Sequence, residues 1–363
     1  MLKAGRGCPT PPLENQSSAR ASMSFQTIAL PAPPGYEPVP ARVLTDISTL
    51  PCDLFIWRGP RPVLYAKRGG DLRRVLTRAQ RGMSFLVREI DSDLLRSAMA
   101  ASLPAIMANG RIAPAERSKT AYSIAAKVLA PVFNRDNSLD HDGLVLTHQA
   151  IDSITMHLIE DEEMVWAMVA TMQKHMATHT HALNTAVYGI VLARFVKLGP
   201  VEAIRDVARG GLLHDIGKNR VPRDVLDKPS GLDSAEWQVM RTHVRAGYDM
   251  VVRAQGFPPS YAHIIAEHHE RCDGSGYPAG RGGAGIALDS QLVAIVDAFD
   301  ALTSRRPYRN GESPFEALRI MRVAMRGQFG DELLREFITL LGGFNALAAG
   351  AGTPDLAAVM RAI

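Results

Sequence analysis

The sequence predicts an α+β protein in which a small N-terminal α/β domain precedes an all-helical bundle. Short runs rich in β-branched and aromatic residues, bounded by Gly and Pro, are confined to roughly the first quarter of the chain. From Asp91 onward, apolar residues recur three and four positions apart, which is the period of amphipathic helices. The 363 residues are 46% hydrophobic and 21% charged, so fibrous and wholly disordered classes are excluded.

The N-terminal segment 1–40 is expected to be a disordered lead-in. Its first residues lack the apolar core of a signal peptide, and Met23 is a candidate start. Residues 27–40, TIALPAPPGYEPVP, are Pro-rich and predict an extended linker. No uninterrupted apolar run reaches about 18 residues, so we expect no membrane span. The three cysteines are scattered and odd in number, which favours a reducing compartment and a cytoplasmic protein.

Residues 41–95 are expected to form the small α/β domain, with a regulatory or association role. CDLFIWRG, PVLYAKRGG and MSFLVREI predict strands, and DLRRVLTRAQRG predicts a helix. Between Arg58 and Arg88 there are nine Lys or Arg and one acid, Asp71. Because few aromatic residues interleave with them, we interpret this run as a solvated basic face rather than a nucleic-acid-binding surface.

The remainder of the chain is expected to be helical. The segments DSDLLRSAMAASLPAIMA, AERSKTAYSIAAKVLAPVF and HQAIDSITMHLIEDEEMVWAMVATMQ have helical spacing, with a polar break at 136–143. We expect a helical connector over 96–170 and a helical domain over 171–340. Residues 341–363, rich in Ala and Gly, form a C-terminal tail in this interpretation.

Histidines are concentrated in the helical domain. Eight of the 11 lie between residues 175 and 269, and only three occur elsewhere. The motifs that contain them are HDIGK from His214, THVRAGYDM around His243 and HHERCDGSGYP from His268. A later segment, DAFDALTSRRPYR, adds Asp297 and Asp300. The motifs are 25 to 33 residues apart, so each group could come from a different helix and meet the others in the core of one bundle.

Imidazole and carboxylate ligands in this number indicate a metal centre. They suit Fe, Mn or Zn better than thiol-preferring metals or the all-oxygen sites of Ca and Mg. Six or more ligands exceed the needs of one catalytic metal, so we expect two metals that share a carboxylate. Two metals about 3.5–4 Å apart can activate water and stabilise a phosphoryl group during phosphoester hydrolysis. Lys218, Arg306 and Arg309 would add positive charge for phosphate.

The motifs HDIGK, HHERCDGSGYP and DAFDALTSRRPYR resemble the signatures of the HD-GYP family, a branch of the HD phosphohydrolase superfamily, over roughly residues 171–335. The resemblance implies an HD-type helical bundle and a bacterial signalling enzyme. It also implies a phosphodiesterase that hydrolyses cyclic di-GMP to linear pGpG and/or GMP, with two divalent ions, Fe or Mn, as cofactors. LPCDLFIWRGPRPVLYAKRGG is similar to N-terminal regions of some bacterial members.

The resemblance also implies roles for individual residues. One metal would be held by His181, His214, Asp215 and Asp297, and the other by Asp215 as the bridge with His243, His268 and His269. Lys218 and Asp215 would be catalytic, and the substrate would be contacted by Lys218, Asp273, Gly274, Gly276, Tyr277, Pro278, Arg306 and Arg309. Some family members have a glutamate four positions before the first His ligand, where it helps to bind a third metal. Here that position is Ala177, which cannot ligate, so we expect a dinuclear site.

Alternatives remain open for the substrate and for turnover. The same centre could act on another cyclic dinucleotide, because ligands define a reaction type more firmly than a substrate. The chain could also bind cyclic di-GMP or a signalling partner with negligible turnover. A homodimer and a signalling protein that docks at the GYP loop are candidate partners, whereas nucleic acid is not expected.

Overall fold

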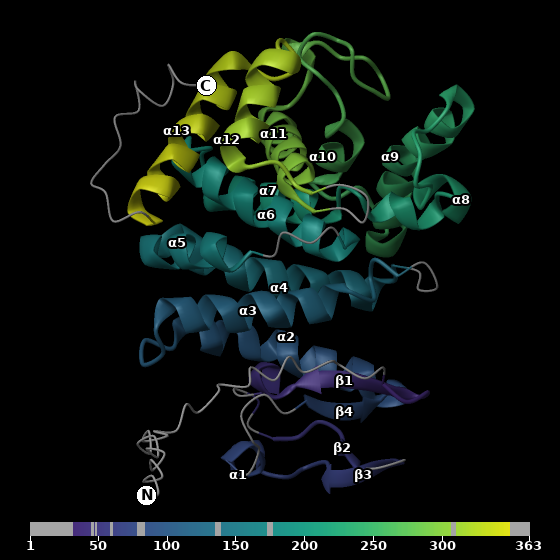
Figure 1. Ribbon diagram of the computed structural model, residues 1–363, viewed down its shortest axis with the longest axis vertical. Helices are drawn as coiled ribbons and strands as arrows, with labels where there is room; N and C mark the ends of the chain where they lie inside the picture. Colours follow the sequence, from purple (N-terminus) through teal and green to yellow (C-terminus); the bar gives the residue numbers. More distant parts are fainter. Residues whose placement is uncertain are drawn as a thin grey trace, which may run out of the picture.

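The computed structural model describes residues 32–44, 47, 49–58, 61–77, 84–134, 139–172, 177–305 and 310–348. A small sheet lies at one end of the molecule, and layers of helices are stacked from it toward the opposite end, where the last helices lie (Figure 1). Within these described ranges, no helix is both long enough and apolar enough to cross a membrane.

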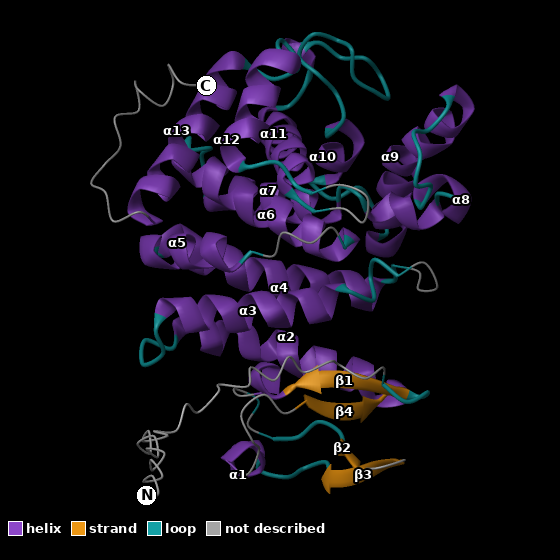
Figure 2. Ribbon diagram, in the orientation of Figure 1, coloured by secondary structure: helices purple, strands orange, loops and turns teal. Residues whose placement is uncertain are grey.

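The N-terminal unit is a four-stranded antiparallel sheet in the order β1-β4-β2-β3 (Figure 2). Its strands are β1 (Tyr36–Pro40), β2 (Leu54–Arg58), β3 (Arg61–Ala66) and β4 (Ser84–Arg88). It also contains α1 (Leu72–Thr77), η1 (Ala41–Leu44) and η2 (Glu89–Asp91). The three strands and the helix that the sequence predicts here are confirmed.

The first strand corrects the prediction of a linker over residues 27–40. Tyr36 to Pro40 pair with Arg88 to Ser84 of β4, and Val39 is fully buried. Proline cannot donate to a sheet ladder, which is why the sequence suggests a linker, but an edge strand needs donors on one side only. β1 is such an edge strand, so Pro38 and Pro40 are compatible with it. The sheet therefore begins before the predicted boundary at residue 41.

The basic run between Arg58 and Arg88 lies on this unit. Six Lys or Arg residues of this run have described side chains, and all six are exposed: Arg58, Arg61, Lys67, Arg68, Arg74 and Arg88. Two of them pair with acids close in sequence, Arg74 with Asp71 and Arg88 with Asp91. This arrangement is that of a solvated surface. Arg78 and Arg81 lie outside the described residues.

The helical connector contains four helices. They are α2 (Ser92–Ala108), α3 (Pro114–Leu129), α4 (His141–Glu160) and α5 (Glu162–Thr171). The predicted helical pattern over 148–173 is divided at Asp161. The backbone of Asp161 is extended, and the Asp161 carboxylate accepts a hydrogen bond from the Met164 amide. Asp161 therefore caps α5.

The remaining helices form the bundle that carries the His motifs. They are α6 (Thr178–Phe195), α7 (Val201–Leu213), η3 (Ile216–Arg220), α8 (Arg223–Leu226), α9 (Ser234–Gln255), α10 (Ala262–Glu267), η4 (Gly283–Gly285), α11 (Leu288–Thr303), α12 (Pro314–Arg319), η5 (Ile320–Ala324) and α13 (Asp331–Ala348). α6 and α11 are buried along most of their length, because α7, α3, α4 and α13 pack around them. The polar side chains of His181, Asn184, Asp297 and Asp300 on these two helices therefore lie in the core.

The last helix corrects the expected tail boundary. α13 continues to Ala348, whereas the sequence predicts a tail from residue 341. Leu340 and Leu341 are buried, so apolar packing continues the helix beyond that boundary. Residues 349–363 lie outside the described part of the chain.

Stability should depend on pH through His263, at the contact of α10 with α11. Its Nε2 lies 2.8 Å from Asp289 Oδ2, and this hydrogen bond raises the pKa of His263 above its ordinary value. The folded chain then holds the proton more tightly than the unfolded chain. The contribution of this hydrogen bond to stability is therefore complete below about pH 6.5 and is lost as pH rises through the raised pKa. Because the pair is partly exposed, we expect it to contribute less than about 1 kcal/mol to the free energy of unfolding.

Urea unfolding of the wild type and of His263→Gln at several pH values tests this expectation. The stability advantage of the wild type should shrink as pH rises above about 6.5. His141→Gln is a suitable control, because the His141 imidazole contacts the Ala254 carbonyl rather than a carboxylate. An advantage that grows with pH would contradict the assignment.

Candidate metal centre

Five imidazoles and two carboxylates meet inside the bundle, and each motif comes from a different helix. His181 lies in α6, His214 and Asp215 follow the end of α7, His243 lies in α9, His268 and His269 follow α10, and Asp297 lies in α11. Most of these side chains are buried, and His214 and His268 are fully buried. The expectation that separate helices bring the His motifs together is confirmed.

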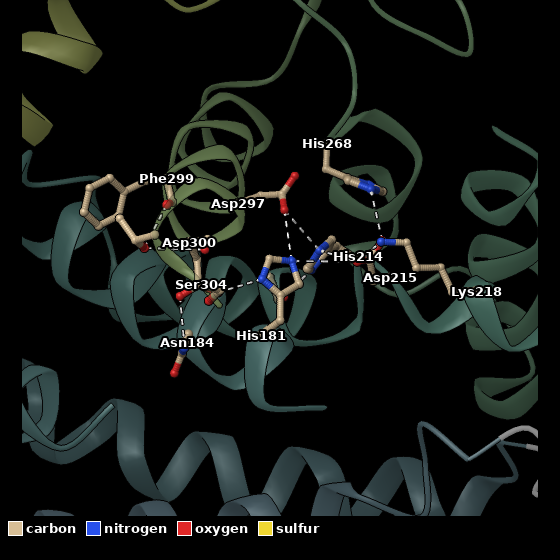
Figure 3. A network of polar contacts seen from close by, with 12 residues as sticks. His181, Asn184, His214, Asp215, Lys218, His268, Asp297, Phe299, Asp300 and Ser304 are labelled. Atoms are coloured by element: carbon tan, nitrogen blue, oxygen red, sulfur yellow. Dashed lines mark hydrogen bonds and ion pairs between the residues drawn. The ribbon is translucent and has the colours of Figure 1, made fainter. Parts of the chain in front are cut away.

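The first group surrounds His181 and His214. His181 Nε2 lies 3.1 Å from Asp297 Oδ1 and 3.8 Å from Asp215 Oδ2. His214 Nε2 lies 3.3 Å from Asp215 Oδ2 and 3.7 Å from Asp297 Oδ1. Figure 3 shows Asp297 above His181, with His214 beside them. Two imidazole nitrogens and two carboxylates therefore face one point.

The second group surrounds the other oxygen of Asp215. His243 Nε2 lies 3.4 Å from Asp215 Oδ1, and His268 Nε2 lies 3.9 Å from the same atom. His269 offers a third imidazole, and the ligand atoms of these four residues lie within 4.8 Å of one another. Asp215 thus presents Oδ2 to one group and Oδ1 to the other, which is the arrangement of a bridging carboxylate.

The donor atoms suit metal ions. In the described chain, His214 Nε2 and Asp215 Oδ1 are buried without a hydrogen-bond partner. Buried polar atoms are costly to leave unpaired, so this pair indicates that a cation belongs between the groups. Imidazole and carboxylate donors suit first-row transition metals and Zn. The structure therefore contains a His/Asp cluster that fits metal binding.

Each of four imidazoles is held at its other ring nitrogen. The Nδ1 atoms of His214, His243 and His268 lie 2.7, 2.8 and 2.9 Å from carbonyls three residues earlier, those of Gly211, Met240 and Ile265. A carbonyl accepts only, so Nδ1–H donates and Nε2 carries the lone pair. His181 differs, because its Nδ1 lies 2.7 Å from Asp300 Oδ2 (Figure 3). These contacts orient four Nε2 atoms toward the cluster.

The two carboxylates are held in the ionised form. Burial alone would raise the pKa of Asp215, but the charge of Lys218 and the interaction with His214 outweigh it and lower this pKa well below the ordinary value. Burial of Asp297 is likewise outweighed, by the hydrogen bond from His181 and by nearby imidazoles, and its pKa is lowered. Both acids therefore offer negative charge to a cation at neutral pH.

Most of the imidazoles are held neutral. Burial lowers the pKa of His243, lowers that of His268 strongly, and lowers that of His269 to about 3. His181 behaves differently: burial opposes its charge, but hydrogen bonds to Asp297 and Asp300 raise its pKa to about 10. The Asp297 side of the cluster therefore attracts positive charge strongly.

The GYP loop folds back against the second group. A Cβ atom on Gly276 would lie 2.4 Å from the Arg271 amide nitrogen and 2.5 Å from Glu270 Cα, so only glycine fits there. The Tyr277 amide donates to the His269 carbonyl over 3.1 Å, and the Tyr277 ring lies 4.7 Å from the His269 ring. The peptide bond between Tyr277 and Pro278 is cis. The loop thus forms a wall beside His269.

The other predicted site residues are placed as follows. Lys218 Nζ lies 2.5 Å from Asp215 Oδ2, at the edge of the cluster. Asp273 is exposed, and its Oδ1 accepts from the Ser275 amide over 2.9 Å, so it shapes the turn that Gly274 passes through at a φ of 78°. Arg306 and Arg309 lie outside the described residues.

Three polar residues that sequence reasoning left without a role support the site. Asp300 contacts His181, Asn184 donates to Asp300 over 2.9 Å, and buried Glu270 accepts from the amides of Ala279 and Arg281 over 2.7 and 2.8 Å. Asn184 and Asp300 each follow an expected ligand by three positions. A polar residue one helical turn after a ligand, in an apolar run, is the signal that could have identified both.

The fold and the site together define a helical protein of the HD type, in which His and Asp side chains from separate helices converge within the bundle. A family model described as HD domain matches residues 158–333. The protein Bd1817, a HDG"Y"P protein from Bdellovibrio bacteriovorus, has a similar fold. Its TM-score is 0.61 at 16% identity, over 85% of this chain and 100% of that chain.

Curated relatives match different shares of the sequence. Cyclic di-GMP phosphodiesterase PA4108 of Pseudomonas aeruginosa is 30% identical over 292 residues, 76% of this chain and 70% of that protein. The response regulator RpfG of Xanthomonas campestris pv. campestris, named a cyclic di-GMP phosphodiesterase, is 42% identical over 36% of this chain and 34% of its own length. The 3'3'-cGAMP-specific phosphodiesterase 3 of Vibrio cholerae is 38% identical over 40% of this chain and 31% of its own length.

This chain belongs to the HD-GYP family of the HD superfamily. It spans more than two thirds of the Pseudomonas relative but only about a third of the other two. The family resemblance expected from the motifs is confirmed, and so is the α+β fold class.

Proposed function

We propose that this chain is a metal-dependent phosphodiesterase that hydrolyses cyclic di-GMP to linear pGpG and/or GMP. The observation that carries the proposal is the sharing of Asp215 between two groups of imidazoles. Such a carboxylate can bring two cations close enough to act on one phosphodiester. Relatives named cyclic di-GMP phosphodiesterases, one of them matched over 70% of its length, support this substrate.

Within this proposal the chain holds two divalent ions, Fe or Mn. Asp215 would be shared between them. His181, His214 and Asp297 would hold one ion, and His243, His268 and His269 would hold the other. When bound, the ions would supply positive charge for the phosphoryl oxygens. They would also lower the pKa of water, so that hydroxide is available as the nucleophile near neutral pH. The ionised Asp215 and Asp297 and the neutral His243, His268 and His269 are already in the protonation states that ligation needs.

The remaining residues bind and orient the substrate. Lys218, held on Asp215, is placed to contact a phosphate oxygen or to protonate the leaving oxygen. The loop from Asp273 to Pro278 lies beside the cluster on the His269 side, because Tyr277 packs on that imidazole. Arg306 and Arg309 grip the guanylate phosphates in this scheme, since guanidinium groups hold phosphate bidentately.

Location and partners belong to the same proposal. Cys52 and Cys272 are free thiols, which suits a reducing compartment such as the cytoplasm. Asp273, Ser275 and Pro278 are exposed at the loop surface, where a signalling protein could dock. We include a homodimer as the expected assembly, with the N-terminal sheet as the associating or regulatory unit.

The test is metal content by elemental analysis on protein purified without oxygen, together with nucleotide turnover on the same sample. We expect about two Fe or Mn per chain and the appearance of pGpG or GMP from cyclic di-GMP. Protein stripped of metal should be inactive and should recover activity on reloading. A chain that carries no metal under these conditions, or two metals without turnover, would contradict the proposal.

A second candidate substrate is 3'3'-cGAMP, favoured by the similarity to the Vibrio cholerae enzyme. It differs from cyclic di-GMP in one base, so the same metal chemistry would serve both. Parallel assays with both nucleotides at equal concentration distinguish them. Faster turnover of 3'3'-cGAMP would show that it, rather than cyclic di-GMP, is the preferred substrate. The reaction type would be unchanged.

A further inference from the structure

A buried tyrosine in the connector is linked to the metal centre without touching it. Tyr122 lies in α3 and is 1% exposed. Its hydroxyl donates to Asn184 Oδ1 in α6 over 2.7 Å. α3 precedes the residues that the HD-domain model matches, and the two partners are 62 positions apart in the chain.

From Asn184 the contacts continue to a proposed ligand. Asn184 Nδ2 donates to Asp300 Oδ1 over 2.9 Å, and Asp300 Oδ2 lies 2.7 Å from His181 Nδ1 (Figure 3). Ser304 Oγ also donates to Asp300 Oδ2, over 3.1 Å. All four side chains are at most 3% exposed, so water competes little for these hydrogen bonds.

The direction of each hydrogen bond fixes the direction of the next. The Tyr122 hydroxyl holds the oxygen of the Asn184 amide, so the nitrogen must face Asp300. If the amide turned over, its oxygen would meet the Asp300 carboxylate, and two acceptors would repel each other. Asp300, held in this way, accepts from His181 Nδ1, and this contact orients His181 Nε2 toward Asp215 and Asp297.

We propose that Tyr122 is a positioning residue for the metal site that contains His181. Helix α3 also reaches the N-terminal sheet, because Lys127 forms an ion pair with Glu37 of β1 and contacts the Pro38 carbonyl. One helix therefore connects the sheet with a ligand of one metal. The inference rests on the proposed dinuclear centre, and it assigns the effect of Tyr122 to only one of the two sites.

The selectivity follows from the geometry. His243 and His268 are held by carbonyls of their own helices, and neither imidazole contacts Asp300 in the described structure. Loss of the Tyr122 hydroxyl should therefore weaken metal binding at the site that contains His181. Metal binding at the site of His243, His268 and His269 should be unchanged. General destabilisation of the bundle would weaken both sites together.

The experiment is a Mn²⁺ titration of the metal-stripped full chain, followed by calorimetry or by competition with a chelator. In Tyr122→Phe, we expect one of the two binding steps to weaken roughly three- to tenfold, the effect of about one buried hydrogen bond. The other step should keep its affinity. Asn184→Ala removes the next member of the series and should weaken the same step by at least as much.

Ser118→Ala is the matched control. Ser118 is a buried residue of the same helix, but its hydroxyl donates to Met164 Sδ over 3.8 Å rather than toward the metal centre. In Ser118→Ala, the Mn²⁺ affinities of the two binding steps should equal those of the wild type. Equal affinities in Tyr122→Phe and the wild type, or equal weakening of both steps, would overturn the inference while the dinuclear centre stands. A wild type that binds no Mn²⁺ would overturn the centre and the inference with it.

Discussion

Asp215→Asn is expected to abolish hydrolysis and to empty both metal sites. Each oxygen of Asp215 faces one group of imidazoles, at 3.3 Å from His214 Nε2 and 3.4 Å from His243 Nε2. The amide keeps the shape of the carboxylate but carries no charge, and its NH₂ group cannot ligate. Turnover should fall by at least about a thousandfold, which corresponds to about 4 kcal/mol in the barrier. Metal content and turnover are measured on the same purified sample.

Asp206→Asn is the matched control for this substitution. Asp206 lies in α7, the helix that ends next to Asp215, and its carboxylate accepts from Ser260 Oγ over 2.7 Å, outside the cluster. The control should retain metal and turnover. Full activity in Asp215→Asn, or normal metal content in that variant, would show that Asp215 does not bridge two ions.

Gly217→Ala is expected to have the largest effect on stability. A Cβ atom at this position would lie 1.9 Å from the His243 carbonyl oxygen and 2.4 Å from the Gly247 amide nitrogen. Both atoms belong to the backbone of α9, so relief requires the helix itself to move away. We expect the free energy of unfolding to fall by about 3 kcal/mol or more. Because α9 carries His243, the variant should also lose metal from the second site.

Gly231→Ala provides the comparison. Gly231 is exposed in the loop before α9, and nothing lies within 4 Å of a Cβ atom built there. Its unfolding midpoint in urea should match that of the wild type. If the free energy of unfolding of Gly217→Ala also stayed within about 0.5 kcal/mol of the wild-type value, the close contact between η3 and α9 would be refuted.

The candidate metal ligands are predictable because their chemistry is carried by residue type. Imidazoles and carboxylates in motifs such as HDIGK and HHERCDGSGYP have few other reasons to occur together in an apolar helical domain. The structure brings all seven of these residues to one place. Their roles as ligands stay predictions, to be tested by the metal measurements.

The residues behind the ligands were less accessible to sequence reasoning. Asp300 was noticed beside Asp297, but its partner His181 is 119 positions away. Tyr122 reads as an ordinary core residue of an amphipathic helix, and its hydroxyl acquires a role only from Asn184. The partners of such hydrogen bonds are set by how helices pack, and no local pattern encodes that packing.

The strand β1 shows the same limit for the fold. A segment with Pro38 and Pro40 has weak strand propensity, and the sequence alone indicates a linker. Pairing with β4 and burial of Val39 override that propensity. By itself, then, the sequence determined the α+β class, the family and the set of candidate metal ligands, because these follow from local periodicity and residue chemistry. Only the tertiary structure decided that Asp215 faces both groups, that Asp300 orients His181 and that α3 contacts both the sheet and Asn184, because these depend on distances between residues far apart in the chain.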